Sequence, residues 1–295
     1  MNPSQLETIL ASYPHTANMR SIITPQVLHR KNLCNSWGIA EGAHLLDIGC
    51  GQGDATLVLA TAVGPAGHIT GVDTGPPDYG SPYTLAQAQA YILASSLGPR
   101  ITFLREDPSK TLEQTIDTFD GAVFCHSLWY FANSSSVENL FLSLAKAGVP
   151  RVYIAEWDGE AKTAAQEPHS LAAQAQMLLH SLRPAEREHG LHEPNIRGAL
   201  LPQDILKLAS TTGWGVAQQG SIQTPPGMMD GHWEVKFVLS DSFQKSLMSE
   251  ELPVDARDIL VGYCDRVKKS ATAIEESHGH VSCMDVMWAV LERES

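Results

Sequence analysis

Basic residues are scarce in this sequence of 295 residues. It holds 20 lysines and arginines against 33 aspartates and glutamates, which gives a formal net charge of −13. No long cluster of lysine or arginine offsets this excess of acidic groups. An acidic surface repels phosphate backbones. The charge balance therefore argues against nucleic acid as a partner.

Long apolar runs and closely spaced cysteines are also missing. No run of about 18 apolar residues could cross a membrane, and residues 1–13 carry polar side chains where a signal peptide needs an apolar core. The cysteines are odd in number and scattered, with no spacing of a zinc site: Cys34, Cys50, Cys125, Cys264 and Cys283. These absences predict a cytoplasmic chain with reduced thiols, no membrane partner and no metal. Its 43% of hydrophobic residues suffices for a sizeable core.

The stretch from His44 to Gly53, HLLDIGCGQG, organises the rest of the chain. Its apolar first half predicts a buried strand, its three glycines predict a tight turn, and residues 55–62 predict a helix that starts on top of that turn. Glycine allows a ligand to approach the backbone, and the free N–H groups of a helix start supply donors. The stretch therefore predicts a cradle for a small ligand. An ordinary strand and turn without a ligand is the plainer alternative.

Two acidic residues indicate which ligand this is. Asp47 stands two positions before the first glycine, where it would repel the pyrophosphate of a dinucleotide but would suit a cationic ammonium group. About 20 residues beyond the turn, a second apolar run ends in Asp73, which can accept hydrogen bonds from a ribose diol. S-adenosyl-L-methionine carries both an ammonium group and a ribose.

The pattern Asp47-x-Gly49-x-Gly51-x-Gly53 resembles motif I of the class I S-adenosylmethionine-dependent methyltransferases. The resemblance covers roughly residues 40 to 240 and implies S-adenosyl-L-methionine as the cofactor. It also implies a doubly wound, mostly parallel seven-stranded Rossmann-like sheet with an antiparallel last strand. The alternation of predicted strands and helices independently favours such a sheet, with its ligand at the carboxyl ends of the strands.

The expected organisation has three parts. Residues 1–39 are predicted to form an N-terminal helical lid, with helices at 3–12 and 24–37 and Pro25 at the first helical position. Residues 40–240 are expected to form the cofactor-binding domain, with a cap inserted at about 159–199. Its strands after the first are predicted at 69–73, 101–105, 119–125, 151–158, 213–222 and 232–239. Residues 241–295 are expected to form a helical extension, with helices at 255–270 and 281–294, that caps the substrate side or forms a homodimer surface.

The expected cofactor contacts lie where four strands end. They are Asp47, Gly49, Gly51, Gly53, Asp73, Thr74, Asp107, Cys125 and His126. The resemblance implies that Asp107 accepts the adenine amino group, although Asp107 before Pro108 also suits a plain turn. Thr74 departs from the family, which more often has a hydrophobic residue there. Tyr79 or Tyr83 could then supply the missing adenine face.

Methyl transfer from a sulfonium requires alignment of the nucleophile, exclusion of water and, for some acceptors, a base. His126, just after the fourth strand, is the first candidate base, and His232 is the second. Either could instead be an ordinary packed histidine. His189 and His192 stand three apart but without the cysteine or carboxylate pattern of a metal site, so a solvated segment is favoured.

Aromatic and methionine residues predict an apolar acceptor pocket, although each alone also suits a core: Trp129, Tyr130, Trp157, Met228, Met229 and Trp233. The favoured function is methyl transfer to O, N or S of an apolar small molecule, of the secondary-metabolite kind. Cys125-His126-Ser127-Leu128 replaces the Asn-Pro-Pro-Tyr type of signature that marks base or amide methylation. The alternatives are non-methylating cyclisation or elimination in the same pocket, and an interaction protein with a merely structural site.

Overall fold

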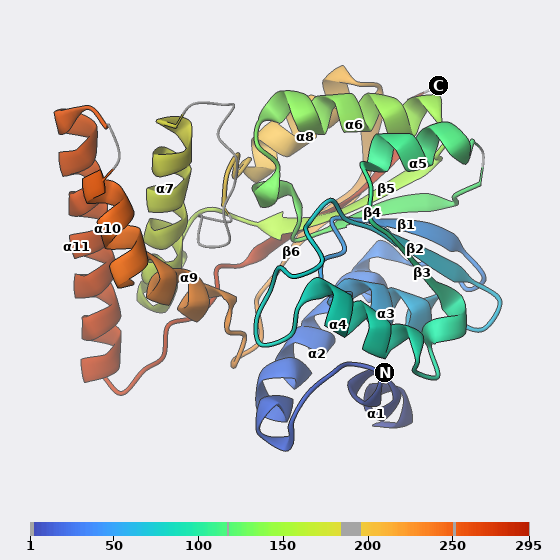
Figure 1. Cartoon of the computed structure of the whole chain (residues 1–295). Helices are drawn as coiled ribbons and strands as arrows, with labels where there is room; N and C mark the ends of the chain where they lie inside the picture. Colours follow the sequence, from blue (N-terminus) through green and yellow to red (C-terminus); the bar gives the residue numbers. More distant parts are fainter. Residues whose placement is uncertain (1–2, 117, 184–195, 250–251, 295) are drawn as a thin grey trace.

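The computed structural model describes residues 3–116, 118–183, 196–249 and 252–294 (Figure 1). Within these residues seven strands form one sheet, in the order β3-β2-β1-β4-β5-β7-β6. Five strands pair in parallel: β1 (His44–Ile48), β2 (His68–Val72), β3 (Ile101–Leu104), β4 (Gly121–Cys125) and β5 (Arg151–Trp157). The last strand, β7 (Val286–Arg293), runs antiparallel to both β5 and β6 (Trp214–Ile222). The predicted fold class is confirmed.

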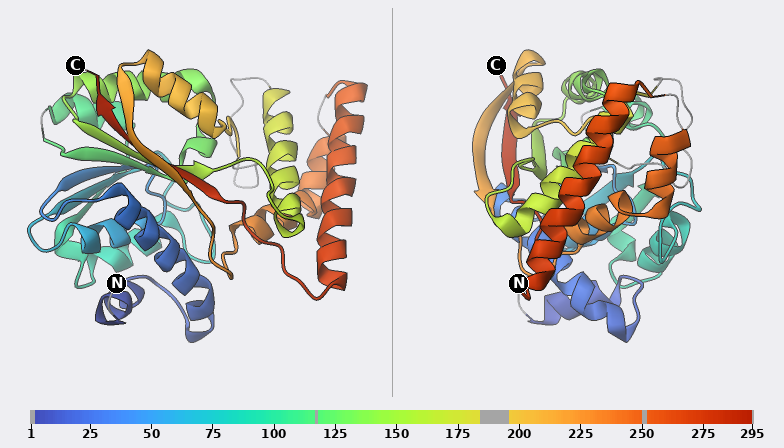
Figure 2. Two further views of the ribbon diagram at one scale, coloured as in Figure 1. Left: turned by 180° about the vertical axis from the view of Figure 1, so that it is seen from behind. Right: turned by 90° about the vertical axis from the view of Figure 1, so that its left-hand side faces the viewer.

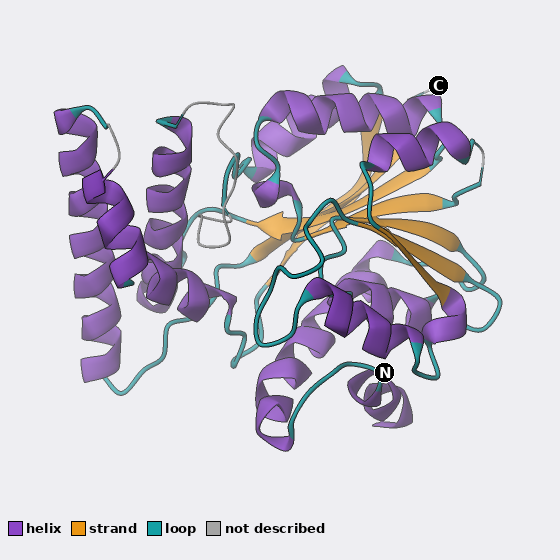
Figure 3. Ribbon diagram, viewed as in Figure 1, coloured by secondary structure: helices purple, strands orange, loops and turns teal. Residues whose placement is uncertain are grey.

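Helices cover both faces of the sheet (Figure 3). One face carries α1 (Pro3–Ala11), α2 (Arg20–Trp37), α3 (Asp54–Ala62) and α4 (Leu85–Leu93). The other face carries α5 (Pro108–Gln114), α6 (Ser134–Lys146) and α8 (Pro202–Thr211). Each layer buries its own apolar cluster against the sheet, which is why the sheet's central strands are apolar on both sides.

Four more helices stand together beyond one end of the sheet (Figure 2). They are α7 (Glu167–Ser181), α9 (Asp230–Val238), α10 (Asp241–Ser249) and α11 (Val254–Glu276). They share a separate core that includes Leu171, Val235 and Leu260. Because α7 follows β5, this helical unit lies at the carboxyl ends of the parallel strands. No helix in the described ranges is both long and apolar enough to cross a membrane.

The last strand comes from a different segment than predicted. Residues 281–294 were expected to form a helix, but Val286–Arg293 is strand β7. This strand lies between β5 and β6, with most of its side chains buried, so it shows a continuous apolar run instead of the alternation of a half-exposed strand. Such a short run fits a helix and a buried strand equally well.

The segment predicted as that last strand is the helix α9. Alternating apolar side chains at 233–239 suggested a strand, but Gly231, Val235 and Val238 are buried along one helical face. An added Cβ at Gly231 would lie about 3.0 Å from His169 of α7, so the two helices approach closely there. Helix α2 also differs, because it begins at Arg20 and contains Pro25 in its interior.

Candidate functional site

The glycine turn after β1 has the backbone of a cradle. Gly49, Gly51 and Gly53 all have positive φ, at 73°, 54° and 95°. A side chain at Gly49 would meet Ser127, with its Cβ 2.7 Å away, whereas a Cβ at Gly51 would meet nothing within 4 Å. The backbone at Gly51 therefore faces open space that a ligand can occupy. This geometry fits a nucleotide-type cofactor at the predicted position.

Asp73 lies against this turn. Its Oδ2 accepts a hydrogen bond from the Gly51 amide at 2.8 Å, and its Oδ1 accepts one from the Gly75 amide at 2.7 Å. Gln89 donates to the Gly51 carbonyl at 2.8 Å and braces the turn from α4. A carboxylate has about four lone-pair sites, so acceptor capacity remains for ribose hydroxyls.

Asp47 lies beneath the turn and is 1% exposed. The Thr56 hydroxyl donates to its Oδ2 at 2.6 Å. Burial raises the pKa of this carboxyl from 3.8 to about 7, with the hydrogen bond from Thr56 opposing the shift. An ammonium group bound above the turn would stabilise the ionised form, so Asp47 suits a cationic ligand more than an anionic one.

The raised pKa of Asp47 predicts a pH dependence of stability. Between pH of about 4 and 7 the folded chain keeps this proton while the unfolded chain has lost it, so the free energy of unfolding falls as the pH rises. At 1.36 kcal/mol per pKa unit, the total is on the order of 4 kcal/mol. Denaturant titrations of the native chain and Asp47→Asn across this window isolate the effect. Equal slopes in both proteins would contradict it.

Three further predicted cofactor residues follow or end the strands β2, β3 and β4. Asp107 caps α5, where its Oδ1 accepts from the Ser109 amide at 2.8 Å, and its side chain is exposed. Thr74 is exposed in the loop after β2. Cys125 ends β4 and is 9% exposed, and burial raises the pKa of its thiol.

His126 lies at the centre of a buried polar cluster. It has a φ of 56°, a conformation that non-glycine residues rarely adopt and that is concentrated at functional sites. Its Nε2 is 2.9 Å from Nε2 of His29, and its Nδ1 is 3.8 Å from Oε1 of Glu156. The ring centroid of Trp157 is 4.4 Å away. The predicted base therefore has a charged partner on one side and a second imidazole on the other.

Glu156 is fully buried and held in place by backbone amides. Its Oε2 accepts from the amides of Leu128 and Trp129 at 2.9 and 3.2 Å, and its Oε1 accepts from its neighbour Trp157 at 3.1 Å. Three such bonds fix the carboxylate beside His126. At 3.8 Å the carboxylate makes no hydrogen bond to His126 Nδ1, but its charge can stabilise a protonated imidazole.

His29 was not predicted from the sequence. It lies on the buried face of α2, and burial, with His126 and Arg30 nearby, lowers its pKa to about 2. His29 is therefore neutral at ordinary pH, and one of the two facing Nε2 atoms must donate to the other. The available signal was a group of three polar residues, Gln26, His29 and Arg30, on the buried stripe of α2.

The predicted acceptor-pocket residues are only partly gathered around His126. Trp157 contacts its ring, whereas Trp129 is buried and donates its Nε1 to the Leu200 carbonyl at 3.1 Å. Tyr130 and Trp233 are exposed by 43% and 47%. Before and within α9, Met228 is buried, Met229 is half-buried and His232 is exposed. His189 and His192 lie outside the described residues.

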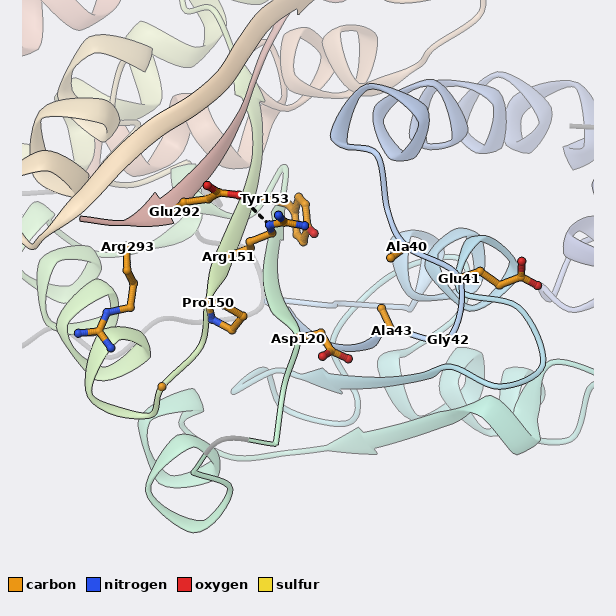
Figure 4. Close-up of a pocket in the computed structure, with 11 residues that line it drawn as sticks. Ala40, Glu41, Gly42, Ala43, Asp120, Pro150, Arg151, Tyr153, Glu292 and Arg293 are labelled. Carbon is orange, nitrogen blue, oxygen red and sulfur yellow. Dashed lines mark hydrogen bonds and ion pairs between the residues drawn. The ribbon is translucent and has the colours of Figure 1, made fainter. Parts of the chain in front are cut away.

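A hollow of about 750 Å³ lies at the other end of the sheet (Figure 4). It is lined at the amino ends of the strands by residues such as Ala43, Asp120 and Arg151, and Arg151 is paired with Glu292 at 2.9 Å. Ligands of open α/β sheets bind at the carboxyl ends. None of the predicted site residues lines this hollow, so it is separate from the candidate site.

Comparisons with known proteins identify the family of the chain. The methyltransferase-domain family matches residues 45–151, which span the glycine turn to the start of β5. Methyltransferase phomM′ of Diaporthe leptostromiformis is 38% identical over 283 residues, covering 85% of this chain and 73% of that protein. The similarity therefore extends well beyond motif I.

Two solved structures are similar across nearly the whole chain. A cyclopropane-fatty-acyl-phospholipid synthase-like protein from Lactobacillus casei has a TM-score of 0.82 and 31% identity, covering 99% of this chain and 100% of that one. The [4+2]-cyclase SpnF has a TM-score of 0.52 and 16% identity, covering 91% of this chain and 81% of that one. The second similarity concerns the fold alone.

Proposed function

Because the chain belongs to the class I S-adenosylmethionine-dependent methyltransferases, we propose that it methylates O, N or S of an apolar small molecule, of the kind made in secondary metabolism. The observation that carries the proposal is the open space at Gly51, braced by Asp73, at the same sheet end as His126. The acidic charge of the chain and the apolar ring of Trp157 beside His126 favour an uncharged, apolar acceptor over a nucleic acid.

The cofactor S-adenosyl-L-methionine would supply an already activated methyl group on its sulfonium. The chain's own residues would bind and orient it, with the glycine turn beneath its methionine–ribose side, Asp73 at the ribose and Asp107 at the adenine. The helical unit at the carboxyl ends would exclude water from the acceptor. His126, backed by Glu156, would take the proton that an alcohol acceptor must lose.

Replacing Asp73 by alanine should weaken cofactor binding by about 1–3 kcal/mol, the scale for an unmatched ribose hydrogen bond. Isothermal titration with S-adenosylhomocysteine measures this. Asp78→Ala, which changes an exposed acid in the same loop, is the control and should bind normally. Asp73→Asn keeps one carbonyl acceptor and should lose less than the alanine variant. Native affinity in the alanine variant would overturn the ribose assignment.

The alternative function uses the same fold and cofactor pocket for a reaction whose product is not a methylated acceptor. The name of one similar structure, a cyclopropane-fatty-acyl-phospholipid synthase-like protein at 31% identity, favours keeping ring formation as this alternative. Product mass separates the two on a panel of apolar metabolites. A cyclisation without transfer leaves the substrate mass unchanged, whereas a simple methyl transfer adds one methylene equivalent per turnover. A ring closed with the cofactor's methyl carbon adds the same mass but loses one proton from that carbon, so a trideuteriomethyl cofactor separates it from methyl transfer by the loss of one deuterium.

A further inference from the structure

Arg30 is a buried cation with unused hydrogen-bond donors. It lies on α2, and its side chain is 10% exposed. Nη2 donates to Asp54 Oδ2 at 3.1 Å, and Nη1 donates to the side chain and carbonyl of Gln26 at 2.7 and 3.4 Å. Nε has no hydrogen-bond partner among the described residues.

The unused donors lie on one edge of the guanidinium. Arginine has five N–H donors. Among the described residues Nε has no partner, and Nη2, which carries two hydrogens, has one hydrogen bond, to Asp54, so the edge formed by Nε and Nη2 keeps donor capacity. This pair forms a fork whose spacing matches the two oxygens of a carboxylate. A buried donor without a partner costs free energy, which a ligand carboxylate would recover.

Arg30 is near both the glycine turn and the end of β4. Its partner Asp54 directly follows Gly53. Burial by itself would lower the pKa of Arg30, but the carboxylates of Asp54 and Asp230 outweigh it and keep the guanidinium charged. The preceding residue, His29, contacts His126 just after β4 at 2.9 Å, so the positive charge lies near two neighbouring strand ends. The methionine part of the cofactor is expected in this place.

The other charged groups around the turn are acidic. Asp47, Asp54 and Asp73 all contact the turn or its helix start, and a ligand carboxylate would be repelled by them. A free amino acid group carries one ammonium and one carboxylate. The ammonium suits these acids, whereas the carboxylate needs a cation, and Arg30 provides one.

We propose that Arg30 binds the α-carboxylate of the cofactor's methionine part through its free Nε–Nη2 edge. This inference rests on the proposed function, because it presupposes a cofactor with an amino acid end. It assigns a cofactor-binding role to a residue of α2, which the sequence alone marked only as part of a lid. The competing reading is that Arg30 only fastens α2 to α3 through Asp54.

Paired titrations of two cofactors test the assignment without relying on turnover. S-adenosylmethionine and its decarboxylated form differ only by the carboxylate. Isothermal titration of the native protein should show about 10²-fold weaker binding of the decarboxylated form, as expected for losing a charge-assisted forked pair. In Arg30→Met the two ligands should bind within about threefold of each other. Arg30→Lys should lie between, because lysine keeps the charge but loses the fork.

Two control variants distinguish binding of the cofactor carboxylate by Arg30 from a purely structural contact between α2 and α3. Arg20→Met removes an exposed arginine of the same helix that pairs with Glu7, and it should keep the native discrimination. Asp54→Asn removes the partner that a purely fastening role requires, and it should also keep the discrimination. If Arg30→Met fails to fold, Arg30→Lys still decides the question, because native discrimination in that variant would overturn the forked contact.

The outcomes are distinguishable. Equal affinity of the native protein for both ligands would overturn the role of Arg30 while leaving the proposed function intact. Discrimination that persists in folded Arg30→Met would also overturn it, because another group would then bind the carboxylate. Failure of the native protein to bind either ligand would overturn the proposed function together with this inference.

Discussion

Replacing His126 by alanine should reduce turnover by about 10²–10⁴-fold and leave cofactor affinity nearly unchanged. The reduction follows from losing the group placed between Glu156 and His29 at the end of β4. It applies to an acceptor that must lose a proton, such as an alcohol. Initial rates on the identified acceptor, with a parallel titration of S-adenosylhomocysteine, measure the two effects separately.

The same assignment predicts a pH dependence. Only a neutral imidazole accepts a proton, so the native rate should rise as the pH is raised. His29, with its pKa lowered to about 2, is already neutral and contributes no step of its own. If His126 only shapes the pocket, His126→Asn or His126→Gln should retain much of the rate with an unchanged pH profile. A near-native rate for the alanine variant on the true acceptor would refute the base assignment.

Gly51→Val should abolish measurable cofactor binding, a loss of more than about 10²-fold. A β-branched side chain is strained at a φ of 54°, and its methyl groups would enter the open space that the ligand needs. Titration with S-adenosylhomocysteine measures the loss.

Gly38→Val is a matched control for this variant. Gly38 ends α2 with a φ of 64°, and a Cβ there also meets nothing within 4 Å, so the control has a similar backbone strain away from the glycine turn. We expect it to lower stability and keep cofactor affinity. If both valine variants bind equally well, the space at Gly51 is not the cofactor site.

The glycine turn and its strand were predictable because their signals are local. The run from His44 to Gly53 contains its own strand, turn and helix start, and the structure has all three where they were expected. Asp73 was predicted as a site residue from its distance in sequence to that turn. Its bonds to the Gly51 and Gly75 amides were not foreseen, since they depend on how two loops meet.

The last strand was not predictable by the same reasoning. Residues 233–237 alternate apolar and polar side chains over a short length, whereas residues 286–291 form a short apolar run that fits either period. Tertiary neighbours determine the secondary structure of both segments. β7 pairs with β5 and β6 in the sheet, whereas α9 packs on α7. These neighbours are distant in sequence and leave no local signal.

The partners of His126 were hidden for a similar reason. His29 is 97 residues away from it along the chain, on a helix whose apolar stripe predicted only packing. Glu156 was expected inside a buried strand, where acidic residues are uncommon, but the sequence did not indicate that it lies beside His126. Arg30 belongs to the same helix and became visible as a cofactor contact only through its position beside Asp54.

Transfer of a labelled methyl group tests the central claim most directly. The native protein would be incubated with S-adenosylmethionine carrying a trideuteriomethyl group and with a panel of apolar metabolites, followed by mass detection. The account predicts one product that gains a single trideuteriomethyl group in place of a hydrogen, together with one equivalent of S-adenosylhomocysteine. A substrate that is converted without gaining the label and without S-adenosylhomocysteine being formed would contradict it.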